Sequence, residues 1–216
     1  VNFWDGTSDE ESLLEKTDTV NKEVIIETAE ELAAFRDNVN NGNTYKDYTV
    51  KLISDIDLLI GDFDSLDVIP NEVKVERLNP IKDDTDVLSA LKFGLKLGYK
   101  DFELYGCIGG RFEHSFANIS ALAFLKLNGA NGIIKFNNQV IELLENEIKL
   151  FDSTYKGYIS CFSYSDKCIV SLKKFKYELE KYEINNSFPL GIDNEFIGKT
   201  SEIEVFDGKL LIIYYV

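Results

Sequence analysis

The chain has 216 residues, 44% of them hydrophobic, which predicts a globular protein of one large domain or two small ones. Its 38 acidic and 23 basic residues give a formal net charge of -15, which argues against nucleic acid as a partner because no dense Lys/Arg surface offsets it. Three cysteines without a CxxC pair argue against a disulfide framework or a zinc site, and no apolar run approaches the roughly 20 residues of a membrane helix.

The first part of the chain predicts an extension followed by a helix and a strand. Residues 1–25 are acidic and rich in hydroxyl side chains, which indicates a poorly ordered extension. Thr28 and Glu31 form a capping-box pattern, and Gly42 suits the end of the helix that they begin. Residues 49–53 are then expected to form a strand.

From Gly61 the pattern alternates between strands and helices, as in a parallel α/β domain. The expected elements are a strand at 73–78, a helix from Asp84-Thr85 to Gly98, a strand at 102–105 and a helix at 113–127. In the second helix Phe116, Ile119 and Ala123 lie on one face. Repeated strand–helix units predict a parallel sheet, which binds ligands at the carboxyl ends of its strands.

After about residue 130 the helical periodicity stops and short β-rich runs take over. The expected strands cover residues 132–136, 139–144, 158–162, 168–172, 202–206 and 210–215. Turn pairs such as Asn137-Asn138 and Asp207-Gly208 separate several of them, as in hairpins. The fold class is therefore α/β plus all-β, with an antiparallel β-sandwich at residues 131–216.

Three motifs at the ends of successive segments carry groups suited to metal and phosphate. They are Gly61-Asp62-Phe63-Asp64-Ser65, Lys82-Asp83-Asp84-Thr85-Asp86 and Gly106-Cys107-Ile108-Gly109-Gly110-Arg111. Closely spaced carboxylates repel one another unless a divalent cation lies between them and shares its charge with phosphate oxygens. Two glycines before an arginine at a helix start favour an anion-binding turn. Together the motifs predict phosphoryl transfer.

Each motif also has a structural interpretation. Asp62 and Asp64 suit caps or turns, one residue of the 83–86 run suffices as a helix cap, and Gly109-Gly110 also suits a plain turn. The surplus of carboxylates favours a site over caps alone. His114 is expected on a helix surface as a supporting residue, because no serine or cysteine constellation accompanies it.

In this order and spacing the motifs resemble the thiamine pyrophosphokinase family, over residues 61–216. Three later segments share the resemblance: Tyr158-Ile159-Ser160, Phe175-Lys176-Tyr177 and Gly191-Ile192-Asp193-Asn194-Glu195. The resemblance implies a parallel α/β nucleotide-binding domain at residues 26–130 and a jelly-roll-like, thiamine-binding β-sandwich at residues 131–216. It also implies Mg²⁺-dependent transfer of diphosphate from ATP to the hydroxyl of thiamine, with release of AMP, by a homodimer.

The resemblance assigns roles residue by residue. Asp62, Asp64 and Asp86 would hold Mg²⁺, and Asp86 would share the metal or assist deprotonation of the thiamine hydroxyl. Arg111, with backbone N–H groups around Gly109 and Gly110, would stabilise the moving phosphates. The other positions implied for the nucleotide are Ser65, Lys82, Asp83, Thr85 and Glu113. Those implied for thiamine are Ser160, Asp193 and Asn194.

The chain departs from the family pattern at three places. Glu113 stands where the family usually has aspartate, and Asp193 stands where it has a serine. The family's first strand with a glycine turn, and its Asp-Gly-Gly segment, have no counterpart before Gly61. Residues 26–58 instead resemble the opening segment of bacterial extracellular β-helix proteins.

These observations predict a thiamine diphosphokinase with ATP and thiamine as partners. A cytoplasmic location is expected from the kinase-like part, while the N-terminal segment by itself indicates export. Two alternatives stay open. One is a kinase-like binding or surface protein without a complete ATP site, and the other, suggested by Asp193, is a phosphotransferase that acts on a different alcohol.

Overall fold

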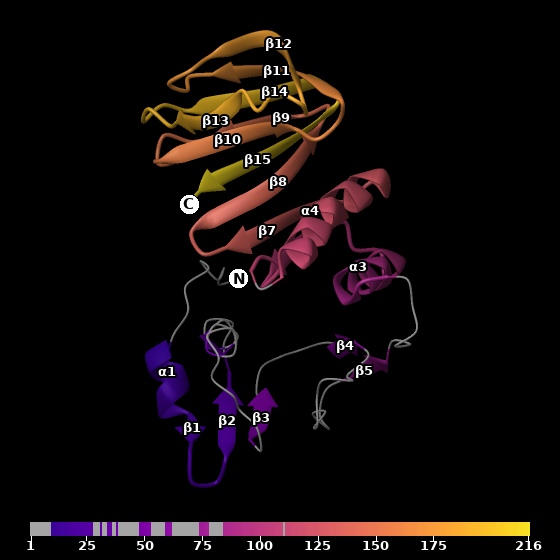
Figure 1. Ribbon diagram of the computed structural model, residues 1–216, viewed down its shortest axis with the longest axis vertical. Helices are drawn as coiled ribbons and strands as arrows, with labels where there is room; N and C mark the ends of the chain where they lie inside the picture. Colours follow the sequence, from indigo (N-terminus) through magenta and orange to yellow (C-terminus); the bar gives the residue numbers. More distant parts are fainter. Residues whose placement is uncertain are drawn as a thin grey trace. The chain divides into compact units, whose positions relative to one another are not determined.

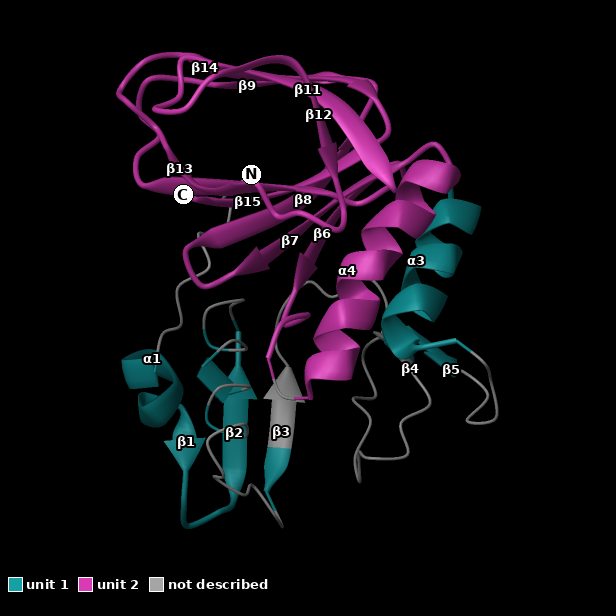
Figure 2. Cartoon of the chain, turned by 45° about the horizontal axis from the view of Figure 1, so that its top comes forward, with its two compact units in different colours: residues 1–98 teal, residues 99–216 magenta. Residues whose placement is uncertain are grey.

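The computed structural model describes residues 10–27, 31, 34–35, 38, 48–52, 59–61, 74–77, 84–109 and 111–216, with the backbone alone for residues 50–52, 59 and 61. The chain divides into two compact units, Val1–Gly98 and Tyr99–Val216, which Figure 2 shows in different colours. This division falls earlier in the chain than the expected start of the β-sandwich at residue 131.

The first unit contains a small three-stranded sheet. Its strands, in spatial order, are β1 (Thr17–Asp18), β2 (Glu23–Ile26) and β3 (Thr49–Leu52). β1 and β2 are antiparallel, whereas β2 and β3 are parallel. Leu13 of helix α1 (Glu10–Glu15) forms a fully buried cluster with Val24 and Ile26 of β2. Residues 10–25 are therefore folded, in contrast to the expected poorly ordered extension, because the scattered apolar residues meet across a turn.

The buried carboxylate of Glu31 joins α1 to the chain that follows β2. It accepts hydrogen bonds from Ser12 Oγ at 2.6 Å, and from the backbone N–H of Glu27 at 2.7 Å. It also forms an ion pair with Lys16 at 2.5 Å. Burial opposes ionisation, but these donors outweigh it and lower the pKa of Glu31 to about 2. The helix expected here is present at the described residues Glu31, Ala34, Phe35 and Asn38.

The first unit ends in a second parallel pair and a helix. β4 (Leu59–Gly61) pairs with β5 (Val75–Arg77), and helix α3 (Asp86–Lys96) contacts β4. The strands expected at 49–53 and 73–78 and the helix expected after Asp84-Thr85 are thus confirmed. Within the described part of this unit, the pairs β2–β3 and β4–β5 belong to separate sheets.

The second unit consists of two stacked sheets with helix α4 (Phe112–Leu127) on the outer face of the larger one (Figure 1). The larger sheet has the order β13-β10-β15-β8-β7-β6, and the smaller has the order β12-β11-β14-β9. Their bounds are β6 (Asp101–Tyr105), β7 (Asn131–Phe136), β8 (Gln139–Glu145), β9 (Ile148–Phe151), β10 (Tyr158–Ser163), β11 (Lys167–Lys173), β12 (Leu179–Asn185), β13 (Gly191–Glu195), β14 (Ser201–Asp207) and β15 (Lys209–Tyr215). Buried side chains from both sheets form one core between them.

The sandwich agrees with the sequence in most respects. All six expected strands after residue 130 are present, and the turns at Asn137 and Gly208 have the positive φ angles of +52° and +80° that their residue types favour. Three strands, β9, β12 and β13, were not expected. β12 is mostly exposed, so it lacks the alternation that reveals a half-buried strand. The pairing is antiparallel except that β6 runs parallel to β7.

Helix α4 buries a face that does not include Phe116. Phe116 is 59% exposed, whereas the residues that α4 buries are Ser115, Asn118, Ala121, Leu122 and Leu125. Gly132 of β7 explains why the face with Leu125 is buried, because a Cβ atom at Gly132 would lie 2.4 Å from Leu125 Cδ1. The leucine side chain occupies the space that this glycine leaves. The helix expected at residues 113–127 is confirmed, and its buried face includes Leu122 and Leu125 but not Phe116.

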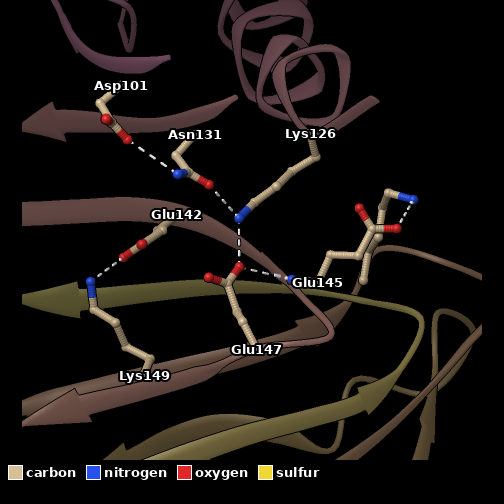
Figure 3. Close-up of polar contacts among 8 residues, drawn as sticks. Asp101, Lys126, Asn131, Glu142, Glu145, Glu147 and Lys149 are labelled. Carbon is tan, nitrogen blue, oxygen red and sulfur yellow. Dashed lines mark hydrogen bonds and ion pairs between the residues drawn. The ribbon is translucent and has the colours of Figure 1, made fainter. Parts of the chain in front are cut away.

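A polar cluster fixes the C-terminal end of α4 (Figure 3). Lys126 donates to Asn131 Oδ1 of β7 at 2.9 Å and forms an ion pair with Glu147 at 2.5 Å. Lys149 of β9 pairs with Glu142 of β8 at 2.8 Å and so links the two sheets. Partly exposed pairs of this kind contribute up to about 1 kcal/mol each, so the Lys126 pair orients α4 more than it stabilises the fold.

The three cysteines, Cys107, Cys161 and Cys168, are buried and form no disulfide, as expected for small core residues. Burial raises the pKa of Cys107 to about 11 and those of the other two to about 12. The described helices include none with the length and apolar character needed to cross a membrane.

Candidate functional site

The turn between β6 and α4 carries the glycine-rich motif. β6 ends at Tyr105, and Gly106 and Gly109 then adopt φ angles of +68° and +119°. These positive angles favour glycine because a side chain would clash with the backbone. Gly110 lies outside the described residues. The backbone therefore reverses sharply between the carboxyl end of a strand and the start of a helix, as the motif predicts.

Two buried side chains of α4 hold this turn from inside. Ser115 Oγ accepts the backbone N–H of Gly109 at 3.1 Å and donates to the C=O of the same residue at 3.2 Å. Asn118 Nδ2 donates to the C=O of Cys107 at 2.8 Å. Because Ser115 and Asn118 are less than 10% exposed, the turn is preorganised by the helix that it precedes.

Arg111 and Glu113 lie at the N-terminus of α4. Arg111 occupies the N-cap position with an extended backbone and makes no side-chain cap. Its Nε donates to Glu113 Oε1 at 2.6 Å, and both side chains are exposed. The pKa of Glu113 is lowered by a bond from its own backbone N–H and by Arg111. The helix start thus offers a guanidinium and backbone donors to an anion, with one carboxylate already beside them. His114 is exposed on the same turn, as expected.

The second acidic motif begins α3. Thr85 is the N-cap, and its hydroxyl accepts the backbone N–H of Leu88 at 3.2 Å. Asp84 pairs with Lys92 at 2.6 Å. Asp86 lies in the first turn of α3 with an exposed side chain. Asp84 and Thr85 therefore support the start of α3, and Asp86 is exposed in the same turn of the first unit.

The remaining nucleotide and metal positions lie outside the described residues: Asp62, Asp64, Ser65, Lys82 and Asp83. Gly61, which precedes Asp62, is the last residue of β4, so the acidic motif follows directly on the carboxyl end of a parallel strand. Among the described side chains, no group of three His, Cys, Asp or Glu residues is placed to hold a metal ion.

Ser160 and Asp193, both predicted to bind thiamine, meet at a bulge between β10 and β13. Ile159 pairs with Asn194 and Cys161 with Gly191, so Ile192 and Asp193 together face the single residue Ser160. The backbone N–H of Asp193 donates to Ser160 Oγ at 3.3 Å. Asp193 has a φ of +58°, an uncommon value for a residue with a side chain. The bulge therefore exposes the Asp193 carboxylate at the edge of the larger sheet.

Asn194 has a different role from its neighbour. It is 4% exposed, and its Oδ1 accepts the backbone N–H groups of Tyr177 and Glu195, each at 2.9 Å. Its Nδ2 donates to the C=O of Tyr177 at 2.7 Å. The amide thus binds both backbone groups of Tyr177, a residue of the segment between β11 and β12.

A groove of about 320 Å³ opens beside Asn194. Its lining is mainly apolar and consists of Leu172, Tyr177, Leu179, Leu190, Gly191, Ile192 and Asn194. Glycine is required at position 191 of this lining, because an added Cβ atom would lie 2.4 Å from the C=O oxygen of Cys161. This volume lies at the lower end of the range for small-molecule sites.

The sequence interpretation missed Ser115 and Asn118, which shape the turn. Their spacing with Leu122 and Leu125 matches one face of a helix. This spacing could have identified Ser115 and Asn118 as buried. A pattern of apolar residues alone favours Phe116, because it does not count polar residues as part of a buried face.

Two sequence models of known protein families match the chain. "Thiamin pyrophosphokinase, catalytic domain" covers residues 39–132, and "Thiamin pyrophosphokinase, vitamin B1 binding domain" covers residues 145–210. The first match contains the β6–α4 turn and begins before Gly61. The second contains the bulge and the groove.

Individual relatives agree with these matches. A thiamine pyrophosphokinase of Bacillus subtilis is 28% identical over 162 residues, which make up 71% of this chain and 75% of that protein. The crystal structure of a thiamin pyrophosphokinase from Geobacillus thermodenitrificans has a TM-score of 0.61 at 27% identity, over 73% of this chain and 76% of that one. A crystal structure of the Bacillus subtilis protein has the same kind of fold, with a TM-score of 0.63 at 23% identity, over 74% and 78% of the two chains.

Both family domains thus occur in one chain, in sequence order, and each contains one of the two places where the structure gathers predicted site residues. The neighbours support an α/β plus β-rich fold. This chain therefore belongs to the thiamine pyrophosphokinase family.

Proposed function

We propose that this chain is a thiamine diphosphokinase, which transfers diphosphate from ATP to the hydroxyl of thiamine and releases AMP. The observation that carries the proposal is the succession of the catalytic and vitamin B1 binding domain matches along the chain. The preorganised β6–α4 turn and the apolar groove support it, because they offer donors to phosphate and an apolar surface to an aromatic vitamin.

Mg²⁺ is the metal that we propose for the reaction, held by Asp62, Asp64 and Asp86. Carboxylate oxygens are its preferred protein ligands, and Asp86 is exposed at the start of α3, so the donor set fits. When bound, the ion neutralises charge on the phosphate oxygens of ATP. This neutralisation matters for a chain of net charge -15, because such a chain repels a polyphosphate anion.

Roles in nucleotide binding are proposed for the β6–α4 turn of the second unit and, separately, for the two acidic motifs of the first unit. Arg111 and the backbone N–H groups near Gly109 and Gly110 would hold phosphate oxygens, where a forked guanidinium and fixed amides are effective donors. Glu113 would share Arg111 with the phosphates. The other contributors in this proposal are Ser65, Lys82, Asp83 and Thr85, the last through its backbone because its hydroxyl caps α3.

In the reaction the thiamine hydroxyl oxygen attacks the β-phosphorus, and the bond from that phosphorus to the oxygen of the leaving AMP breaks. The hydroxyl proton must be removed, and Asp86 is our candidate either as the base or as a further metal ligand. Arg111 would stabilise charge on the transferred group.

Thiamine is proposed to bind in the second unit, near Ser160, Asp193 and Asn194. The acidic side chain of Asp193 suits a cationic thiazolium, and the groove suits the rings. Asn194 would act by shaping the groove, since its amide is engaged with the backbone of Tyr177.

The functional domains proposed are a parallel α/β nucleotide-binding domain at residues 26–130 and a thiamine-binding sandwich from residue 131. The boundaries of the two family matches support this division, as do the parallel pairs β2–β3 and β4–β5. A homodimer and a cytoplasmic location stay predictions from the family resemblance.

The test is AMP release from Mg-ATP with and without thiamine, compared between the wild-type chain and Asp62→Asn. We expect thiamine-dependent release that the substitution abolishes. A folded wild-type chain that releases no AMP would contradict the proposal. Calorimetry that then showed thiamine binding without Mg-ATP binding would indicate a binding protein, and release that depends on another alcohol would indicate a different phosphotransferase.

A further inference from the structure

We infer that Lys135 is a positioning residue for the nucleotide, which acts by fixing Tyr105 at the start of the β6–α4 turn. The inference rests on the proposed function, since it takes this turn as the place that holds phosphate oxygens of ATP. Lys135 belongs to β7 and lies between the two family matches, which end at residue 132 and begin again at residue 145. Lys135 is therefore a residue of this chain that neither match contains.

The pairing of β6 with β7 brings Lys135 beside the end of the strand that precedes the turn. The two strands are parallel, so their carboxyl ends lie at the same edge of the sheet, and Tyr105, the last residue of β6, is directly opposite Lys135. A Cβ atom at Gly132 would lie against Leu125 of α4 and Leu104 of β6, which places Gly132 and Leu104 on the α4 face of the sheet. Because side chains alternate along a strand, Tyr105 and Lys135 lie on the opposite face.

Three side chains on that face, Glu103, Tyr105 and Lys135, form the Lys135 cluster. Lys135 forms an ion pair with Glu103 Oε2 at 2.8 Å, and the Tyr105 hydroxyl donates to the same oxygen. The Lys135 ammonium lies 5.5 Å from the centre of the Tyr105 ring, within the range of a cation–π contact. Burial lowers the pKa of Lys135, but its bonds to Glu103 and Tyr105 outweigh this effect and raise the pKa above its usual value. A charged ammonium thus holds Tyr105 through both the ring and the shared carboxylate.

Tyr105 is the residue from which the turn starts. Gly106 follows with a φ of +68°, and Cys107 Sγ donates to the C=O of Tyr105 at 3.5 Å. From the other face of the sheet, Asn118 of α4 holds the C=O of Cys107. The turn is thus anchored at its start by the Lys135 cluster and at later residues by α4. Backbone N–H donors stabilise a phosphate best when they are fixed before it binds, so loss of either anchor should weaken Mg-ATP binding.

The test compares two ion pairs between neighbouring strands of the same sheet. The control pair joins Lys209 of β15 to Glu145 of β8 at 2.7 Å, and its lysine side chain is 23% exposed, against 18% for Lys135. For Lys135→Ala we expect kcat/KM for Mg-ATP to fall about threefold to tenfold, because the turn is displaced from its productive geometry. The KM for thiamine should stay within about twofold. Lys209→Ala should change neither parameter by more than about twofold. Lys135→Arg keeps the charge and should come closer to the wild type than Lys135→Ala.

The action of Lys135 through Tyr105 is tested by a double-mutant cycle. Tyr105→Leu keeps an apolar side chain but removes the hydroxyl and the ring. In that background Lys135→Ala should lower kcat/KM for Mg-ATP by less than about twofold. Glu103→Gln is a second variant if Lys135→Ala does not fold, because it removes the charge that pairs with Lys135 and keeps an oxygen acceptor. We expect it to lower kcat/KM for Mg-ATP about twofold.

Calorimetry of Mg-ATP binding without thiamine separates this inference from the proposed function. In Lys135→Ala the Kd for Mg-ATP should rise about threefold to tenfold, whether or not the chain turns over thiamine. A wild-type chain that binds Mg-ATP but releases no AMP with thiamine would overturn the function alone, and one that does not bind Mg-ATP would overturn both. An unchanged Kd in Lys135→Ala, an equal rise in Lys209→Ala, or full additivity with Tyr105→Leu would overturn the inference alone.

Discussion

The β6–α4 turn and the groove beside β13 are built in opposite ways. In the turn, the charged groups Arg111 and Glu113 are exposed, and the backbone is held from inside by Ser115 and Asn118. In the groove, the apolar lining is open, and a buried amide and a glycine fix its shape. Both places use a buried polar side chain to fix a loop, but they present different chemistry to solvent.

The difference fits the two kinds of ligand that we propose for these places. A phosphate is recognised by charge and by N–H donors, which need only a fixed backbone and can stay hydrated until the ligand binds. A neutral or singly charged aromatic ring gains most of its binding free energy from apolar contact, which needs a shaped surface. Variants of each place should therefore affect one substrate and spare the other.

The largest expected effect is that of Arg111→Ala in the turn. Loss of a forked donor to the transferred phosphate should lower kcat for AMP release about 10²- to 10³-fold. Thiamine binding, measured by calorimetry, should not change. Lys156→Ala is the control, since Lys156 is an exposed cation of the same unit outside the turn. If kcat fell no further in Arg111→Ala than in this control, Arg111 would have no role in transfer.

A smaller effect is expected from Asn118→Ala, which acts on the same turn from inside. The C=O of Cys107 would lose its buried partner, at a cost of about 1–3 kcal/mol in the free energy of unfolding. The loosened turn should also lower kcat/KM for Mg-ATP about tenfold. Asn128→Ala is the matched control at the other end of α4, where the exposed Asn128 amide donates to the C=O of Phe124. Equal losses of kcat/KM for Mg-ATP in the two variants would show that α4 does not act through the turn.

The smallest effect should come from Gly191→Ala in the groove. The added methyl group would meet the C=O of Cys161, so we expect the KM for thiamine to rise about threefold to fivefold with the KM for ATP unchanged. Gly198→Ala provides the comparison, because Gly198 has a φ of +70° with open space around its Cα. That variant should cost about 1 kcal/mol of stability through backbone strain alone. A rise in the KM for ATP in Gly191→Ala would contradict the assignment of the groove to thiamine.

Local sequence patterns were sufficient to predict structural features that depend only on residues adjacent in the sequence. Thr85 as the N-cap of α3, Gly208 in a hairpin turn and most strands of the sandwich all follow from a few adjacent side chains. The buried face of α4 could not be predicted in this way, because Gly132 on a later strand decides which side chains of the helix fit against the sheet. Strand β12 was not predicted for a similar reason, because its pairing with β11, and not its own composition, makes it a strand.

From the sequence by itself, phosphoryl transfer and, through the family resemblance, thiamine binding could be predicted. The acidic motifs, the glycine-arginine turn and the segments at residues 158–160, 175–177 and 191–195 on which these predictions rest are short and local. The sequence did not determine which of the predicted residues are exposed and which are buried and hold the backbone. Asn194 and Asp193 are adjacent, yet the bulge opposite Ser160 turns one inward to hold Tyr177 and leaves the other exposed. Only the tertiary structure decided this, because the register between strands that are distant in sequence depends on long-range packing and not on local propensity.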